Sequence, residues 1–154
     1  MLHIEALAHR EPALATRIQA VIALAHAQEA QLLLIADVPP SAKTAFEIAA
    51  DGDCYLGALL NGELVGVLSF GPEEEPQQLC ISTLAVHPGA QRQGAGRRLV
   101  LAALARAPGA TFSVAATAGN APALALYQAL GFMPYRRGVI GPQQLPLLKL
   151  RRIA

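Results

Sequence analysis

A glycine-bearing segment between Gln91 and Gly96 (QRQGAG) has the residue types of an anion-binding loop. A strand predicted to end at Val86 precedes the segment, and a helix predicted to begin near Gly96 follows it. A strand-to-helix loop directs several backbone N–H groups to one point, and the helix N-terminus adds partial positive charge. Gly94 and Gly96 permit an approach to the backbone that a Cβ would block. The segment therefore favours a pyrophosphate ligand.

Two familiar phosphate-binding motifs differ from this segment. A P-loop would end in Gly-Lys-Ser/Thr, whereas Gly96 is followed by Arg97 and Arg98. A dinucleotide fingerprint needs G-x-G-x-x-G, and only G-x-G is present here. Taken alone, the same residues are also compatible with a simple strand-to-helix turn.

The residues before this loop predict two helices followed by an antiparallel run of strands. Residues 2–7 form the first expected strand, and Pro12 opens a helix that carries an apolar stripe. Ser41 is expected to cap a second helix that runs through Ala50. Asn61-Gly62 is a strong hairpin signal because both residues tolerate positive φ. Strands are expected on both sides of this turn and again before the loop, over residues 54–60, 63–70 and 77–86.

The second half of the chain alternates helices and strands. A strand, a helix and a strand in succession imply parallel pairing of the two strands. The predicted fold is α/β (α+β), a mixed, twisted central sheet of about six to seven strands flanked by helices, in the order β-α-α-β-β-β-α-β-α-β-β. The length of 154 residues fits one domain over residues 1–154. The elements expected here are helices over 96–107 and 122–130 and strands over 111–116, 133–139 and 145–150.

Two segments of this half resemble the motifs of the GNAT superfamily of N-acetyltransferases. The segment from Gln91 to Gly96 looks like the family's Q/R-x-x-G-x-G/A acetyl-CoA motif. Residues 120–132 (NAPALALYQALGF) resemble its N-x-x-A-x-x-L-Y-x-x-L-G-F segment, at the expected distance. The hairpin over residues 56–70 also resembles the family's second and third strands. The resemblance implies a GNAT-like fold, with acetyl-CoA as cosubstrate.

The resemblance also implies roles for the matching residues. Backbone amides from Gln91 through Arg97 would hold the pyrophosphate of CoA, and main-chain groups of Leu84 and Val86 would pair with the pantetheine arm. Asn120 would lie near that arm, cap the helix that Pro122 opens, or do both. The full set of cofactor-binding candidates is Leu84, Ala85, Val86, Gln91, Arg92, Gln93, Gly94, Ala95, Gly96, Arg97, Asn120 and Tyr127.

Tyr127 is the candidate general acid that the family motif supplies. When an amine attacks the thioester, negative charge develops on the departing CoA sulfur. A phenol with a pKa of about 10 is protonated at neutral pH and can donate to that sulfur. The alternative role of Tyr127 is core packing together with Leu124 and Leu130.

The general base is left open between several side chains. An amine that is protonated at neutral pH must lose a proton before or during attack. The three adjacent carboxylates of residues 73–75 are of a kind that usually forms a solvated loop tip. His87 lies in a turn before Pro88, and Ser82 would act only through a bound water. Some branches of the family supply a Glu from this strand, and none lies between Gln77 and Val86. The candidates are Glu73, Glu74, Glu75, His87 and Ser82.

Composition and charge restrict the classes of partner. A formal net charge of +1 gives no electrostatic footprint for nucleic acid. No apolar run approaches the ~20 residues of a membrane span, and no secretion signal is evident. Cys54 and Cys80 lack metal-ligand spacing and are interpreted as reduced thiols, which predicts a cytoplasmic protein without a metal requirement. His26 is interpreted as a partly buried surface histidine.

The resulting hypothesis is an N-acetyltransferase that moves an acetyl group from acetyl-CoA to a primary amine of a small molecule or peptide by direct attack on the thioester. The alternative is a non-catalytic CoA- or acetyl-CoA-binding sensor or regulatory subunit. The acceptor stays open among small-molecule amines, amino acids, polyamines and protein N-termini, and the loop over 138–144 is expected to border its pocket. Exposed sheet edges make a homodimer plausible by fold analogy.

Overall fold

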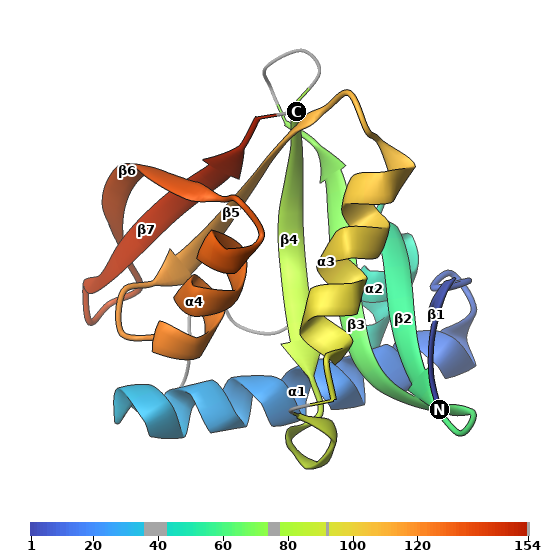
Figure 1. Ribbon diagram of the computed structural model, residues 1–154. Helices are drawn as coiled ribbons and strands as arrows, with labels where there is room; N and C mark the ends of the chain where they lie inside the picture. The colour runs from blue at the N-terminus through green and yellow to red at the C-terminus, as the bar shows by residue number, and fades with distance from the viewer. Residues whose placement is uncertain (36–42, 74–77, 92, 154) are drawn as a thin grey trace.

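A mixed sheet of seven strands forms the centre of the molecule (Figure 1). The computed structural model describes residues 1–35, 43–73, 78–91 and 93–153. The strands lie side by side in the order β1-β2-β3-β4-β5-β7-β6. Their bounds are β1 Leu2–Ala6, β2 Cys54–Leu60, β3 Glu63–Pro72, β4 Gln78–Val86, β5 Thr111–Thr117, β6 Met133–Ile140 and β7 Leu145–Arg152. The predicted fold class and element order are confirmed.

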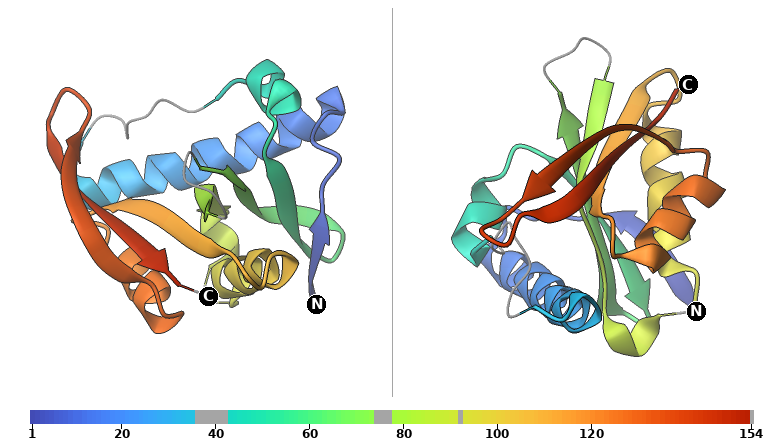
Figure 2. Two further views of the ribbon diagram at one scale, coloured as in Figure 1. Left: turned by 90° about the horizontal axis from the view of Figure 1, so that it is seen from above. Right: turned by 90° about the vertical axis from the view of Figure 1, so that its left-hand side faces the viewer.

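Helices cover both faces of this sheet (Figure 2). The first face carries α1 (Pro12–Leu33) and α2 (Ala45–Ala50), and the opposite face carries α3 (Ala95–Arg106) and α4 (Ala121–Ala129). A short 3-10 helix, η1 (Pro88–Ala90), follows β4 and precedes α3. Within the described residues, no helix is long and apolar enough to cross a membrane.

Each face of the sheet has its own buried core. Under α1 and α2, Ile18 and Ile48 pack with Tyr55 of β2, and all three are almost fully buried. Under α3 and α4, Leu99 packs with Phe112 of β5 in a larger cluster. Burial of a large apolar side chain contributes about 1.5–3 kcal/mol. These contacts fix where α1 and α3 lie relative to the strands between them.

The pairing of β4 with β5 is parallel and short. It joins Gln78 to Thr111 and ends at the pair Ile81 and Val114, whereas every other ladder of the sheet is antiparallel. Because α3 connects the two strands, the parallel pairing confirms the predicted strand-helix-strand unit. Beyond Ile81 the two strands no longer pair, so the sheet opens between them. The β5-facing edge at the end of β4 therefore lies outside the ladder.

The turns follow the sequence signals closely. Asn61 and Gly62 have φ of 52° and 85°, so both adopt the left-handed conformation that a two-residue hairpin requires. Gly131, with φ of 93°, follows the end of α4 as predicted. The strand β3 runs two residues farther than predicted, through Pro72, because Gly71 and Pro72 still pair with β4.

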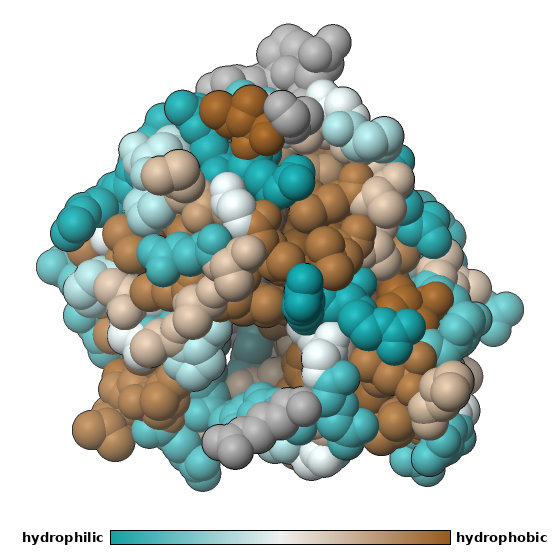
Figure 3. Space-filling view, viewed as in Figure 1, coloured by the Kyte–Doolittle hydropathy of each residue, from teal (hydrophilic) through white to brown (hydrophobic). Residues whose placement is uncertain are grey.

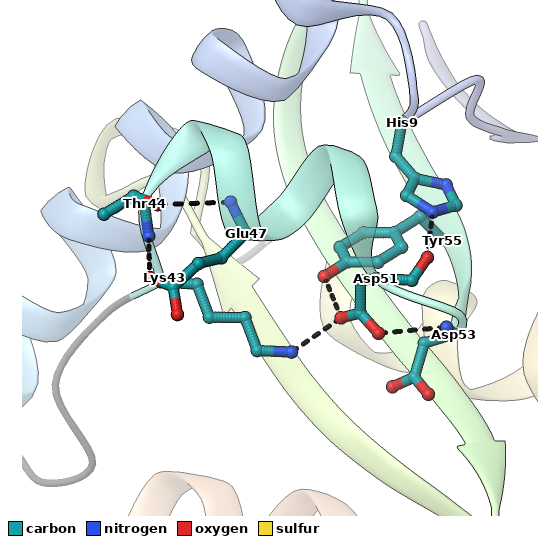
Figure 4. Close-up of polar contacts among 7 residues, drawn as sticks. All are labelled: His9, Lys43, Thr44, Glu47, Asp51, Asp53 and Tyr55. Carbon is teal, nitrogen blue, oxygen red and sulfur yellow. Dashed lines mark hydrogen bonds and ion pairs between the residues drawn. The ribbon is translucent and has the colours of Figure 1, made fainter.

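The start of α2 differs from the prediction. Thr44 caps the helix, since its hydroxyl accepts from the amide of Glu47 while the Glu47 carboxylate accepts from the Thr44 amide. The predicted cap, Ser41, lies outside the described residues. At the other end, Asp51 accepts hydrogen bonds from Lys43 at 2.6 Å and from the Tyr55 hydroxyl at 2.7 Å (Figure 4). This network secures the corner between α2 and β2.

Candidate active site

A cavity of about 660 Å³ opens where β4 and β5 separate. Figure 3 shows the surface hollowed between α4, the beginning of α3 and α1. The volume is in the usual range for a small-molecule site. Nine of the twelve predicted cofactor-binding residues line it: Leu84, Ala85, Val86, Gln91, Gly94, Ala95, Gly96, Arg97 and Asn120.

Two of the other predicted residues, Gln93 and Tyr127, do not line the cavity. Gln93 is exposed and does not line the cavity, and Arg92 lies outside the described residues. Tyr127 is also absent from the lining, although its neighbours Ala123 and Leu126 belong to it. The structure thus brings nine of the candidates into one site, and Tyr127 lies on α4 next to two residues of the lining.

The two glycines of the loop have different physical roles. Gly94 is the N-cap of α3 with φ of 78°, and a Cβ there would meet no atom within 4 Å. Glycine is needed at this position for its backbone conformation, because non-glycine residues rarely adopt this φ. Gly96 faces the side chain of Leu126, which a Cβ would approach to 3.3 Å. Gly96 therefore permits close packing of α3 against α4, and the first amides of α3 stay available to a ligand.

The exposed edge of β4 forms a second side of the site. Leu84 and Val86 pair with β3 on one side, but they lie beyond the last pair between β4 and β5. Backbone groups on the β5-facing edge can accept an extended ligand as an added strand would. The anion-binding helix start and this open edge share one cavity, which suits an elongated molecule with phosphates at one end.

Asn120 performs the capping role expected of it and has another contact as well. Its side-chain oxygen accepts from the Ala123 amide at 3.3 Å, which caps α4. Its amide nitrogen donates to Glu29 of α1 at 3.0 Å. The hydroxyl of Thr117, at the end of β5, donates to the same oxygen of Glu29 at 3.1 Å. One carboxylate on α1 thus joins the end of β5 to the start of α4.

Glu29 is the functional candidate that sequence reasoning missed. It is half-buried and lines the cavity together with His26 and Gln28 of the same helix. The signal was available, because Glu29 lies seven residues after Ile22 and so continues the apolar stripe of α1. His26 is half-buried as predicted, but its position in the cavity wall was not foreseen.

Tyr127 is buried, with 4% of its surface exposed, and its ring packs on Phe132 at a centroid distance of 5.7 Å. Burial raises the pKa of the phenol, and the negative charge of Glu29 raises it further. The hydroxyl is therefore protonated at neutral pH, as a proton donor must be. The packing role that the sequence allowed for Tyr127 is also present.

The candidate bases of the sequence analysis are scattered. His87 accepts a hydrogen bond from the Gly89 amide at 2.9 Å, so it stabilises the turn after β4. Ser82 is exposed and forms a β-bulge in β4, because Ser69 of β3 pairs with Thr83 and Phe70 pairs with Ile81. Glu74 and Glu75 lie outside the described residues.

The prediction of a solvated acidic tip is wrong for Glu73. Its side chain is half-buried and accepts a hydrogen bond from the hydroxyl of Ser113, which is itself buried. Its amide bonds the carbonyl of Gln78, so Glu73 lies at the start of β4. The eight residues from there to Val86 span about 26 Å along an extended strand. Glu73 therefore lies far from the loop that begins α3.

The splayed sheet and the cavity at its opening define an α+β fold with a site that suits a phosphate-bearing ligand. The chain matches the Acetyltransferase (GNAT) family over residues 19–132, most of its length. The chain therefore belongs to the GNAT family of acetyltransferases.

Two curated relatives and one solved structure show how far the similarity extends. The chain is 35% identical to N-alpha-acetyltransferase RimI of Mycobacterium tuberculosis (strain ATCC 25618 / H37Rv), over 68% of this chain and 67% of that protein. It is 32% identical to UPF0157 protein YqkA of Bacillus subtilis (strain 168) over 84% of this chain, but it spans only 37% of YqkA. The ribosomal-protein-S18-alanine N-acetyltransferase from Escherichia coli has the same fold, with a TM-score of 0.77 at 20% identity over 99% of this chain and 93% of that chain.

Membership of this family defines the chemistry of the site. GNAT acetyltransferases use acetyl-CoA and acetylate amine acceptors, and this chain belongs to that family. The residues present fit such a donor on two observations of this structure. The left-handed Gly94 places free amides of α3 at the cavity, and the end of β4 has an unpaired edge beside them.

Proposed function

We propose that the protein transfers the acetyl group of acetyl-CoA to a primary amine of a small molecule or peptide by direct attack of the amine on the thioester. The observation that supports this most strongly is the shared cavity. It places the start of α3, the open edge of β4 and the cap of α4 around one space. A donor that is held along this space is oriented for attack from the sheet opening, and such positioning can supply much of the rate.

In this proposal, different groups of the chain bind different parts of acetyl-CoA. Amides at the start of α3, from Gly94 to Arg97, hold the pyrophosphate, and the helix dipole favours its charge. Main-chain groups of Leu84 and Val86 hold the arm that leads to the thioester. Asn120 keeps α4 in place through its cap. Tyr127 donates a proton to the sulfur as it leaves, because its phenol is protonated at neutral pH.

For the acceptor, the relatives favour a peptide amino terminus among the open classes. RimI of Mycobacterium tuberculosis is an N-alpha-acetyltransferase, and it shares 35% identity with this chain. The Escherichia coli enzyme with the same fold acts on an alanine of ribosomal protein S18. Small-molecule amines stay in the proposal, because the acceptors of these two enzymes are known for those proteins and not for this one. A single domain, a cytoplasmic location and a homodimer stay predictions.

The experiment is a thiol-release assay with acetyl-CoA, run beside calorimetric CoA binding. The acceptors are a peptide with a free N-terminus, the same peptide with a blocked N-terminus and an internal Lys, a polyamine and a set of amino acids. Turnover on the free N-terminus alone supports the peptide acceptor, and turnover on another amine redirects the acceptor class. CoA binding without turnover on any amine supports the sensor alternative and contradicts the proposal.

A further inference from the structure

A carboxylate from α1 enters the cavity that the donor would occupy. Glu29 lines this cavity together with Leu84 of β4 and Gly96 of α3, so it lies where the strands diverge. Its helix approaches from the face of the sheet opposite α3 and α4. The apolar stripe of α1, including Ile18 and Ile22, is buried in the core of that face and fixes the direction of Glu29.

The hydrogen bonds of Glu29 fix the carboxylate and leave one oxygen open. Thr117 and Asn120 both donate to Oε2, at 3.1 and 3.0 Å. Within the described residues, no group donates to Oε1 of Glu29. Two donors on one oxygen hold the plane of the carboxylate, and the other oxygen can still accept a proton from a ligand in the cavity.

The charges around Glu29 suit a cationic ligand. His26 from α1 and Arg97 from the start of α3 line the cavity with Glu29. Tyr127 from α4 does not line it, but the charge of Glu29 acts on its phenol. The described residues form ion pairs only between His3 and Glu5 and between Lys43 and Asp51, so no cation of this part of the chain pairs with Glu29. A half-buried carboxylate without a cation partner favours an ammonium group in the cavity.

We propose that Glu29 is the general base that takes the proton of the acceptor amine. This inference rests on the proposed transfer to a primary amine. The amine nitrogen forms a bond to the acetyl carbonyl carbon, and the bond between that carbon and sulfur breaks. The proton of the nitrogen passes to Oε1 of Glu29, directly or through one water. The sulfur takes the hydroxyl proton of Tyr127 and leaves a phenolate. The proton held by Glu29 then returns to that phenolate through water, which restores both groups for the next turnover.

The placement of Glu29 also couples the two proton transfers. The negative charge of Glu29 is the second cause, after burial, that raises the pKa of Tyr127. When the carboxylate gains the amine proton, this charge disappears and the phenol becomes more acidic. Deprotonation of the incoming amine therefore favours donation to the departing sulfur. Among the described base candidates, His87 is used in a turn and Glu73 lies at the far end of β4, so neither offers such a link.

The test is the Glu29→Gln variant, because the amide can still accept hydrogen bonds from Thr117 and Asn120 while it cannot take a proton. We expect kcat/KM at pH 7 to fall by about 10² to 10⁴-fold, the usual contribution of a positioned base. The variant depends on amine that is already neutral. Its kcat/KM should therefore rise about tenfold per pH unit up to the pKa of the amine, along a steeper profile than the wild type.

Two further variants separate catalysis from structure. Glu11→Gln removes an exposed carboxylate at the start of the same helix and should leave both the rate and the pH profile unchanged. Thr117→Val removes one donor to Glu29 but keeps the carboxylate, so it should lower the rate much less than Glu29→Gln and keep the wild-type profile. Thermal unfolding of each variant shows whether the fold is retained.

The outcomes distinguish this inference from the proposed function. If the wild-type enzyme is active and Glu29→Gln has the same rate and pH profile, Glu29 is not the general base. That result does not contradict the proposed acetyl transfer. A rate loss without the steeper pH profile also overturns it, because that result indicates a positional effect alone. A wild-type protein that turns over no amine contradicts the proposed function itself.

Discussion

Gln28 of α1 and Gln91 of the loop before α3 exchange two amide hydrogen bonds, at 3.0 and 2.5 Å, although 63 residues separate them. The pair ties the first helix to the segment expected to hold the pyrophosphate. Together with the bonds from Thr117 and Asn120 to Glu29, it connects α1 to both walls of the opening between β4 and β5. The first helix, whose sequence has no family motif, therefore contributes to the shape of the site.

Gln28→Ala should weaken CoA binding by loosening this loop. A net hydrogen bond contributes about 1 kcal/mol, so we expect the Kd for CoA to rise about fivefold in calorimetry. The control is Gln31→Ala, which removes an exposed side chain of the same helix. An unchanged Kd in Gln28→Ala would show that the amide pair does not organise the loop.

Gly94→Ala should also weaken CoA binding, for a conformational reason. An added methyl group meets no atom within 4 Å, but the φ of 78° disfavours any residue with a Cβ. The loop then changes its path, and we expect a Kd for CoA at least about fivefold higher. Gly109→Ala is the matched control, since its methyl group also meets nothing and its φ is not positive. Equal Kd values for the two variants would contradict the prediction.

Tyr127→Phe should lower kcat by about 10 to 10⁴-fold, the range for loss of a positioned acid, with little change in the Kd for CoA. The ring and its packing on Phe132 stay in place, so the stability of the variant should be close to that of the wild type. Steady-state rates and calorimetry measure the two quantities. Tyr135→Phe, at an exposed ring of β6, is the control. Wild-type turnover in Tyr127→Phe would remove the phenol from the mechanism.

Asp51→Asn should destabilise the corner between α2 and β2 in a pH-dependent way. Burial raises the pKa of Asp51, but hydrogen bonds from Lys43, the Asp53 amide and Tyr55 outweigh it and lower the pKa to about 2. A carboxyl with a lowered pKa stabilises the fold above its ordinary value of 3.8, and that stabilisation is lost as the pH falls toward 2.

The free energy of unfolding in urea measures this effect for the wild type and the variant. Their difference should be full at pH 7 and should shrink between about pH 4 and pH 2. Glu63→Gln, at an exposed carboxylate of the hairpin, should show no such difference at either pH. If the difference in unfolding free energy between the wild type and Asp51→Asn does not change with pH, the hydrogen bonds assigned to the Asp51 carboxylate are contradicted.

Local chemistry explains which features the sequence predicted well. Asn61-Gly62 needs positive φ at both positions, and this need is visible in the residue types themselves. Gly94 was expected to permit close approach of a ligand, and its positive φ was not predicted. The predicted strand from 54 to 60 matches β2 at both ends, since the turn residues mark its limits. Most cofactor candidates lie between residues 84 and 97, so their closeness in the sequence already places them near one another at the end of β4 and the start of α3.

Features that depend on tertiary contacts were missed. Glu29 reaches the cavity only because α1 lies across the opening between β4 and β5, and no local pattern specifies that crossing. Glu73 was expected in solvent, but the parallel pairing of β4 with β5 brings Ser113 within hydrogen-bonding distance. Thr44 and Ser41 are both good caps by residue type, and the Glu47 three residues after Thr44 was the local sign that favoured Thr44.

The strand order has a consequence for how the protein is made. Because β7 lies between β5 and β6, the hairpin joins the sheet through its second strand. A nascent chain that has reached only Ile140 presents β6 without its neighbour and β5 with an open edge. Domains fold from the N-terminus as the ribosome adds about 5–20 residues each second. Until residues 145–152 are free to form β7, that edge of β5 is thus open to pairing with another chain.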